Sequence, residues 1–237
     1  MINKITIIGV GLIGGSLASA LKSNNLANIV FGYGRDQNRL EAATKEGIID
    51  QYSTDLKIAV DGADIVVIAT PVGSFESLLH DLKPLITQHM IVTDVGSTKS
   101  SIANSAKNIL DEMLSNFIPA HPIAGKEKSG FEASDASLFL NKKVILTPLD
   151  TNLPESINTI KKMWEDVGAN VDFMSSESHD ELLGMTSHLP HMLAFSLVNY
   201  LVSQNPSASI YAAGGFKDFS RIASGDAVMW SDICLNN

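Results

Sequence analysis

One histidine in this chain stands in a setting that suggests acid–base chemistry. His121 opens the stretch HPIAGKEKSG, residues 121–130, which sets it among small, stiff and charged residues. The imidazole side chain has an ordinary pKa of about 6.5, so a neutral histidine accepts a proton near neutral pH. Oxidation of an alcohol requires such an acceptor, because the hydroxyl proton must leave as the hydride departs. His121 is therefore a candidate catalytic base; the alternative is a loop histidine that hydrogen-bonds only to backbone.

A glycine-rich turn near the N-terminus predicts a binding site for the hydride acceptor. The apolar run 5–8 predicts a buried strand, the motif GVGLIG follows it directly, and Leu17 and Leu21 continue with helical spacing. In a Rossmann unit the three glycines permit the tight turn, the approach of a pyrophosphate and close helix–strand packing, and the diphosphate lies on free N–H groups at the helix N-terminus. The expected cofactor-binding residues are Gly9, Gly11, Leu12, Ile13 and Gly14. A hydride acceptor beside a proton acceptor indicates a dehydrogenase.

The end of the second expected strand, residues 28–33, bears on the choice of cofactor. A carboxylate there would bind the ribose 2′-hydroxyl of NAD, whereas an arginine accommodates the 2′-phosphate of NADP. The chain has Gly34 at the expected position of the carboxylate, and Arg35 follows, which favours NADP. Asp36 keeps NAD open. The alternative is that Arg35 and Asp36 only begin the next helix, with Asp36 as its N-cap.

Length, charge and cysteine content restrict the class of protein. The 237 residues, 45% of them hydrophobic, suffice to bury the core of one large or two modest domains. A net charge of -9 without a basic cluster argues against nucleic acid or an anionic membrane as a partner. The single Cys234 excludes an internal disulfide framework, and no apolar run reaches the roughly 20 residues of a membrane-spanning helix. The chain begins with a strand rather than a signal peptide, so we expect a cytoplasmic protein.

Further apolar runs alternate with helical patterns and predict a doubly wound α/β sheet. Residues 65–69, 90–93 and 143–147 are short continuous runs, as buried parallel strands should be. Residues that directly follow such strands should converge at one edge of the sheet, where ligands bind. Thr70 and Pro71 are therefore expected to contact the cofactor, and Ser97 is expected near His121, although capping of the next helix is an equally good role for that hydroxyl.

After about residue 173 the pattern becomes purely helical. Leucines at helical spacing between residues 178 and 203 predict a long helix that bends near Pro190. We therefore expect a dinucleotide-binding domain over residues 1–173 and a helical domain over 174–237. His188 and His191 share a helical face, but without a third ligand nearby in sequence we favour a polar or substrate-facing role over a metal site. The remaining histidines, His80, His89 and His179, are expected to be solvated.

The chain resembles the prephenate and arogenate dehydrogenases of tyrosine biosynthesis. Four sequence blocks carry the resemblance, in the family's order and spacing: GVGLIGGS near the N-terminus, DVGSTKS at 94–100, HPIAGKEKSG at 121–130, and SHLPH with GGFKDFSRIA at 187–191 and 214–223. The resemblance implies a Rossmann domain joined to an all-helical domain that forms a homodimer, with the active site between the two domains.

The resemblance also implies the reaction and the roles of individual residues. Prephenate loses a hydride from C4 to NAD(P) and loses its ring carboxylate as CO2, which makes the ring aromatic; no metal is needed. His121 would accept the proton of the C4 hydroxyl and Ser97 would orient the imidazole. Arg221 would bind a substrate carboxylate, although a surface salt bridge is the default role of an arginine. The residues expected near the substrate with less definite roles are Glu127, Lys217, His188 and His191.

Three departures from the family pattern leave questions open. Gly34 replaces the acidic residue of NAD-preferring members, and Lys126 stands where threonine is frequent, which leaves prephenate or arogenate as the substrate. Family members continue with further helices beyond the segment that ends this chain at Asn237, so we expect a partial helical domain. The other hypotheses are a β-hydroxyacid dehydrogenase, which would place a catalytic lysine where this chain has histidines, and a non-enzymatic dinucleotide sensor or scaffold.

Overall fold

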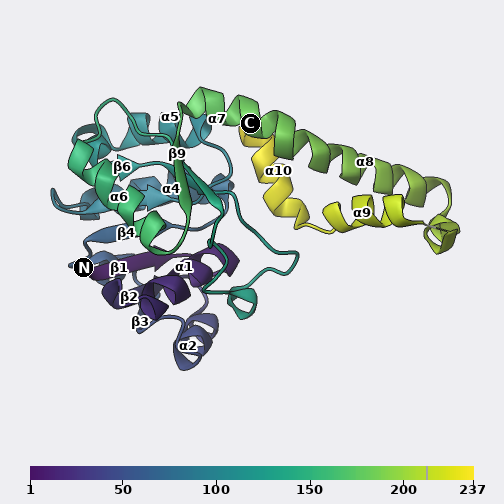
Figure 1. Cartoon of the computed structure of the whole chain (residues 1–237). Coiled ribbons are helices and arrows are strands. Elements are labelled where there is room, and N and C mark those ends of the chain that lie inside the picture. Colours follow the sequence, from purple (N-terminus) through teal and green to yellow (C-terminus); the bar gives the residue numbers. More distant parts are fainter. Residues whose placement is uncertain (212) are drawn as a thin grey trace.

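A six-stranded parallel sheet forms the centre of the N-terminal part of the chain (Figure 1). The computed structural model describes residues 1–211 and 213–237. The strand order is β3-β2-β1-β4-β5-β6, which is the order of a Rossmann sheet. The chain adds strands first on one side of β1 and then, from β4 onward, on its other side, so the switch point of the topology lies between β1 and β4. The strands are β1 (Ile2–Ile8), β2 (Ala27–Tyr33), β3 (Gln51–Ser53), β4 (Ile65–Ile68), β5 (Ile91–Asp94) and β6 (Phe117–Ile118). The predicted Rossmann-type fold is confirmed.

Helices cover both faces of this sheet, which explains why its strands are continuously apolar. Alternate residues of β4 enter different cores: Ile65 and Val67 pack in one cluster with α1, and Val66 and Ile68 pack in the other with α4 and α5. A strand buried on both faces has no polar side, so its sequence shows a run rather than an alternation. The helices are α1 (Leu12–Ser23), α2 (Gln37–Lys45), α3 (Leu56–Val60), α4 (Phe75–Leu82) and α5 (Ser100–Ile109).

A second, three-stranded sheet carries His121. Strand β7 (Ala120–Pro122) pairs antiparallel with β8 (Lys143–Leu146), and β8 pairs parallel with β9 (Asn170–Phe173), which follows helix α6 (Pro154–Asp166). The expectation that residues 143–147 belong to the parallel Rossmann sheet is therefore wrong. His121 lies opposite Ile145 in the register of this pairing, so it belongs to a strand and not to a loop.

The C-terminal part is helical, as predicted. Helix α7 (Ser176–Leu183) continues through a π-helical turn (Gly184–His188) into α8 (Leu189–Gln204), and α9 (Gly214–Ile222) and α10 (Ala227–Asn236) follow. Pro190 has no N–H to donate to the carbonyl one turn earlier, and the wide turn precedes it directly. Figure 1 shows α8 reaching away from the sheets, with α9 along it and α10 returning toward them. There the backbone N–H of Gly73 donates to Asp232 on α10, at 3.2 Å.

Helix α8 leaves much of its apolar surface uncovered. Leu193 is 56% exposed and Leu197 is 36% exposed, and Met229 on α10 is 40% exposed. Among the residues that the structure describes in α8, only Ala194 is buried. The exposed apolar side chains of α8 and α10 therefore mark a surface that a partner would cover.

No helix in the described ranges is long and apolar enough to span a membrane.

Candidate active site

The glycine-rich turn has the geometry that a dinucleotide diphosphate requires. Gly9 has a φ of +95°, and a Cβ there would lie 2.7 Å from the carbonyl oxygen of Ala69. A Cβ on Gly14 would lie 2.3 Å from the Gly9 oxygen, so only glycine allows α1 to approach β1 this closely. No atom lies within 4 Å of a Cβ on Gly11, the N-cap of α1. The first N–H groups of α1, those of Leu12 and Ile13, have no partner within the helix, as at any helix N-terminus.

Residues at the end of β4 lie against this turn. The Cγ2 atom of Thr70 would be 3.1 Å from a Cβ on Gly9, so the structure brings these two predicted cofactor residues together. The Thr70 hydroxyl accepts a hydrogen bond from Ser74 at 2.9 Å, and Pro71 is exposed beside it. The edge of the sheet at β1 and β4 is the switch point where Rossmann folds bind their dinucleotide.

The residues expected to select the cofactor have different roles. Asp36 is the N-cap of α2, and its carboxylate accepts hydrogen bonds from the backbone N–H groups of Asn38 and Arg39 at 3.0 and 3.2 Å. The capping alternative considered for Asp36 is thus observed. Arg35 is exposed, and within residues 1–211 and 213–237 its side chain has neither an ion pair nor a hydrogen bond. Its guanidinium is available to a ligand.

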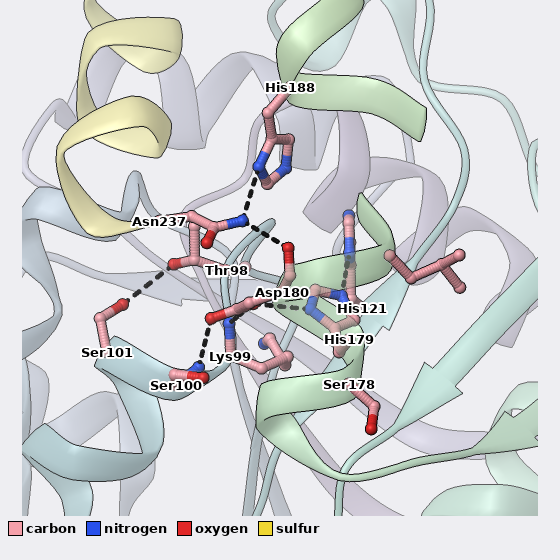
Figure 2. A network of polar contacts seen from close by, with 12 residues as sticks. Thr98, Lys99, Ser100, Ser101, His121, Ser178, His179, Asp180, His188 and Asn237 are labelled. Carbon is pink, nitrogen blue, oxygen red and sulfur yellow. Dashed lines mark hydrogen bonds and ion pairs between the residues drawn. The ribbon is translucent and has the colours of Figure 1, made fainter. Parts of the chain in front are cut away.

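His121 stands at the end of a row of three hydrogen-bonded side chains (Figure 2). Its Nδ1 lies 2.8 Å from Nε2 of His179, and Nδ1 of His179 lies 2.8 Å from Oδ1 of Asp180. His179 and Asp180 are neighbours on α7, and His179 is fully buried. The expectation that His179 is solvated is therefore wrong, because it lies on the side of α7 that faces His121 and packs on α5.

The surroundings of His121 favour its neutral form. Burial lowers the pKa of the imidazole well below 6.5, and the charges of Lys99, His179 and His188 lower it further, while Asp180 acts in the opposite direction. For Asp180, burial raises the pKa of the carboxyl, but hydrogen bonds from His179 and from backbone N–H groups outweigh it and lower the pKa to about 2. At neutral pH, His121 is therefore an uncharged acceptor and Asp180 is a carboxylate.

The Asp180 carboxylate also caps helix α5. It accepts hydrogen bonds from the backbone N–H groups of Lys99 and Ser100, both at 2.8 Å. The N-cap of α5 is Lys99, so Ser97 does not cap this helix. Ser97 is partly buried, and no hydrogen bond joins it to His121 in the part of the chain that the structure describes. The predicted orienting role of Ser97 stays a prediction, whereas Nδ1 of His121 has His179 as its partner.

A fully buried ion pair fixes the backbone next to His121. Lys99 Nζ contacts the carboxylate of Asp94 and donates to the carbonyl of Ala120 at 2.7 Å. Asp94 accepts from the N–H of Ala120 at 3.0 Å and from the N–H of Gly96 at 2.7 Å. Burial raises the pKa of Asp94 and lowers that of Lys99, and each charge offsets part of the other's shift. Both polar backbone atoms of the residue before His121 are therefore held by the pair.

His188 and His191 lie beside Trp230. His191 stacks on the indole with a centroid distance of 3.7 Å, and His188 meets it edge-on at 6.2 Å. His188 is buried, and its Nδ1 lies 2.9 Å from the amide nitrogen of Asn237. In the ranges 1–211 and 213–237, no group of three metal-ligating side chains comes together. The structure thus places His188 near the His121 network, joined to it through Asn237 (Figure 2). His191 lies three residues further along the chain.

The remaining predicted substrate-binding residues lie on exposed surfaces. Arg221 on α9 approaches Glu127, which follows β7, with 3.8 Å between Nη1 and Oε1. The two side chains are 56% and 62% exposed, so this contact alone contributes little to stability. Lys217 lies one turn earlier on α9 and is exposed as well. Two residues that lie far apart in the sequence, Arg221 and Glu127, are therefore close in space.

Family models match nearly the whole chain. The model for the prephenate dehydrogenase nucleotide-binding domain matches residues 17–173, and the model for the prephenate dehydrogenase dimerization domain matches residues 175–237. The chain belongs to the prephenate dehydrogenase family. The glycine-rich turn lies before the first matched range, but the solved structures of the family include it in their similarity to this chain.

Individual relatives within the prephenate dehydrogenase family agree with this assignment. A prephenate dehydrogenase of Bacillus subtilis is 37% identical over 100% of this chain and 65% of its own length. A cyclohexadienyl dehydrogenase of Zymomonas mobilis is 34% identical over 98% of this chain and 80% of its own. A structure of prephenate dehydrogenase from A. aeolicus, in complex with hydroxyphenyl propionate and NAD+, is 39% identical, with a TM-score of 0.93 and coverage of 99% and 82%. The chain thus spans about two thirds of the length of its Bacillus relative.

Sequence reasoning assigned no role to His179, Asp180 and Lys99, and it expected Asp94 only to lie at the sheet edge near the cofactor. One signal was present for His179: it precedes Leu183 by one helical turn, which places it on the apolar side of the expected helix. Lys99 gave no such signal, because lysine is almost never fully buried unless it is paired.

Proposed function

We propose that this member of the prephenate dehydrogenase family oxidises and decarboxylates prephenate to 4-hydroxyphenylpyruvate, with NAD or NADP as the hydride acceptor. One observation carries the proposal: a partly buried imidazole, His121, whose pKa is lowered well below 6.5, is held at a fixed place in a protein that also has a dinucleotide-binding turn. Family membership and the 37% identity to a prephenate dehydrogenase support the choice of substrate.

The dinucleotide would be held at the carboxyl edge of the Rossmann sheet. The open side of Gly11 and the free N–H groups of Leu12 and Ile13 fit a diphosphate, and Thr70 and Pro71 line the neighbouring strand end. When bound, the nicotinamide supplies the acceptor for the hydride that leaves C4. We favour NADP slightly, because Arg35 is free to meet a 2′-phosphate while Asp36 is engaged as a helix cap.

His121 would move the proton of the reaction. As hydride leaves C4, the C4 hydroxyl gives its proton to Nε2 of His121, and the oxygen becomes the carbonyl of a dienone. Loss of the ring carboxylate as CO2 returns an electron pair to the ring, which becomes aromatic. The phenolate oxygen then takes the proton back from Nε2 of His121. A base that is neutral before the reaction and returns its proton afterwards fits the lowered pKa of this imidazole.

The other predicted site residues would bind or orient the substrate. Arg221 suits a substrate carboxylate, since its guanidinium is exposed and only loosely paired with Glu127. We expect Lys217, His188 and His191 to lie beside the bound substrate and to contribute to its binding. Ser97 would share in orienting the imidazole or the hydroxyl that it deprotonates.

The test is turnover of prephenate, followed through the absorbance of NAD(P)H, in wild type and in His121→Asn. We expect the variant to lower kcat by about 100-fold or more, because general base catalysis typically contributes about 10²–10⁴. Dinucleotide binding should change little, because the turn after β1 is untouched. Equal turnover of the two proteins would reject His121 as the base.

The same assay with arogenate decides between the two substrates. Lys126, which replaces the frequent threonine, is paired with Asp135 at 2.9 Å and is not free to bind a second carboxylate without breaking that pair. A structure of a Synechocystis arogenate dehydrogenase is 29% identical to this chain. Higher kcat/KM for arogenate than for prephenate would replace our substrate assignment and leave the chemistry unchanged.

We also infer that the protein is a homodimer made through its helical domain, residues 174–237, with residues 1–173 as the dinucleotide-binding domain. The exposed Leu193, Leu197 and Met229 and the match to a dimerization domain support this arrangement. The cytoplasm is the compartment that we propose. Sedimentation velocity tests the dimer: a monomer at concentrations that support full activity would contradict it.

A further inference from the structure

The row of side chains behind His121 has a defined direction of hydrogen bonding. Asp180 is a carboxylate and only accepts, so His179 must donate to it from Nδ1. With the ring proton of His179 on Nδ1, the lone pair on its Nε2 is free, and that atom accepts. The hydrogen bond of 2.8 Å between the two imidazoles therefore uses the proton on Nδ1 of His121. Only Nε2 of His121 is left with a free lone pair.

We propose that His179 and Asp180 are positioning residues that hold His121 as the Nδ1–H tautomer and so present its Nε2 as the proton acceptor. This inference rests on the proposed function of His121 as the base. It extends that function, because a free imidazole exchanges between two tautomers and rotates, whereas this one is fixed by a donor–acceptor chain. In a Ser–His–Asp triad the aspartate holds the tautomer of the catalytic histidine directly. Here His179 stands between Asp180 and His121 and passes on the same constraint.

Three features show that the row is built into the fold. His179 is fully buried, so water does not compete for either of its nitrogens. The Asp180 carboxylate is held in place by the N–H groups of Lys99 and Ser100 at the start of α5. The backbone at Ala120 is fixed by the buried pair of Lys99 with Asp94. The imidazole of His121 is thus constrained from its backbone and from its Nδ1 side.

Within the row, Asp180 offsets part of the charge that forms on His121 when it takes the proton. The groups that oppose a positive imidazolium are three cations or potential cations: Lys99 at the N-cap of α5, His179 on α7 and His188 on the π-helical turn. Asp180 is the anion that acts in its favour, since the ammonium of Lys99 is already paired with Asp94. The imidazolium keeps its hydrogen bond to His179, which relays the influence of the Asp180 charge.

Two variants of His179 separate positioning from general damage. In His179→Gln, the amide oxygen accepts from Nδ1 of His121 and the amide N–H donates to Asp180, so the direction of the row is kept. In His179→Leu, the volume is similar but Nδ1 of His121 loses its acceptor. His80 is an exposed histidine on α4, and His80→Leu serves as the matched control.

The first measurement is the tautomer of His121, read from the ¹⁵N resonances of histidine-labelled protein without substrate. In wild type and His179→Gln we expect a protonated Nδ1 and an unprotonated Nε2. In His179→Leu we expect a population with the proton on Nε2. The proposal is overturned if the wild type carries its proton on Nε2, or if His179→Leu keeps the wild-type tautomer. This readout does not require turnover, and the tautomer of the wild-type protein is by itself enough to overturn the proposal.

The second measurement is steady-state turnover of prephenate. We expect kcat of His179→Leu to fall by about 100-fold or more with KM changed by less than about threefold, since a wrong tautomer in a related triad costs about 10⁴. His179→Gln should retain kcat within about tenfold, and His80→Leu should match wild type. A loss in the glutamine variant as large as in the leucine variant would contradict positioning. If wild type shows the Nδ1–H tautomer but no turnover of prephenate, the proposed function fails and the positioning of His121 stands.

Discussion

Removal of the ammonium of Lys99 should expose the energetic cost of the buried carboxylate beside it. Lys99→Met keeps the apolar stem but leaves Asp94 fully buried, with only the N–H groups of Ala120 and Gly96 as partners. Burial raises the pKa of Asp94, so without its counter-charge the carboxyl should take up a proton. Keeping it protonated at pH 7 costs about 1.4 kcal/mol for each of the roughly three pH units above the ordinary aspartate pKa, or about 4 kcal/mol.

This magnitude agrees with the effect expected from breaking a buried pair, about 3–5 kcal/mol. The loss of stability in Lys99→Met should also depend on pH. The folded variant keeps a proton on Asp94 that the unfolded chain has released, so the free energy of unfolding should fall by about 1.4 kcal/mol for each unit of rising pH. The wild-type protein, with the pair intact, should lack this term.

The assay is urea unfolding across about pH 5 to pH 8, followed by the fluorescence of Trp164, which is fully buried in the sheet domain. Asp94→Asn combined with Lys99→Met is the control: its neutral amide needs no counter-charge, so most of the stability should return and the pH slope should vanish. A cost below about 1 kcal/mol for Lys99→Met, without a pH slope, would refute the description of this pair as buried and charged.

Four further variants or conditions have defined outcomes. Gly14→Ala should destabilise the protein by about 1–3 kcal/mol and abolish dinucleotide binding, because its Cβ would lie 2.3 Å from a backbone oxygen of the same turn; urea unfolding and NADP titration measure both. Gly34→Asp should shift the ratio of kcat/KM toward NAD, since the nearest side chain is 3.7 Å from the new Cβ; a wild type that already strongly prefers NAD contradicts the role of Arg35. Arg221→Ala should raise KM more than it lowers kcat. Acidification from pH 7 to about pH 5 should lower the free energy of unfolding, because the pKa of His121 is depressed in the folded state and the unfolded chain protonates first; the slope is at most about 1.4 kcal/mol per pH unit for this group, and it should be flatter in His121→Asn.

The parts of the fold that the sequence predicted are those defined by local patterns. The strand, turn and helix around Gly9 and Gly14 follow from the order of apolar residues and glycines within a short segment. The strand at 143–146 was also visible, but its sheet was not. Val144 and Leu146 are buried, as an apolar run predicts, but their partners Pro122 and Ala120 are set by a long-range pairing that apolar runs do not specify.

The same distinction applies to the site. His121 was found because its neighbours along the chain form a recognisable stretch. Its hydrogen-bond partner, His179, lies 58 residues later, in a helix whose sequence has no motif for this contact. Asp36 shows the opposite case: two chemical roles fitted its position, and the structure decided for the helix cap because its carboxylate faces the N–H groups of α2.

The position of Asp180 couples the helical part of the chain to the proposed base. It lies on α7, the first helix after the sheets, yet it caps α5, which belongs to the Rossmann part. Against the effect of burial, the hydrogen bond from His179 and the two backbone donors at the start of α5 lower the pKa of this carboxyl, and only an ionised carboxylate imposes the direction of the row to His121. The packing of α7 on α5 thus completes the row of side chains behind the proposed base. A change that loosens α7 should therefore remove turnover and leave dinucleotide binding in place.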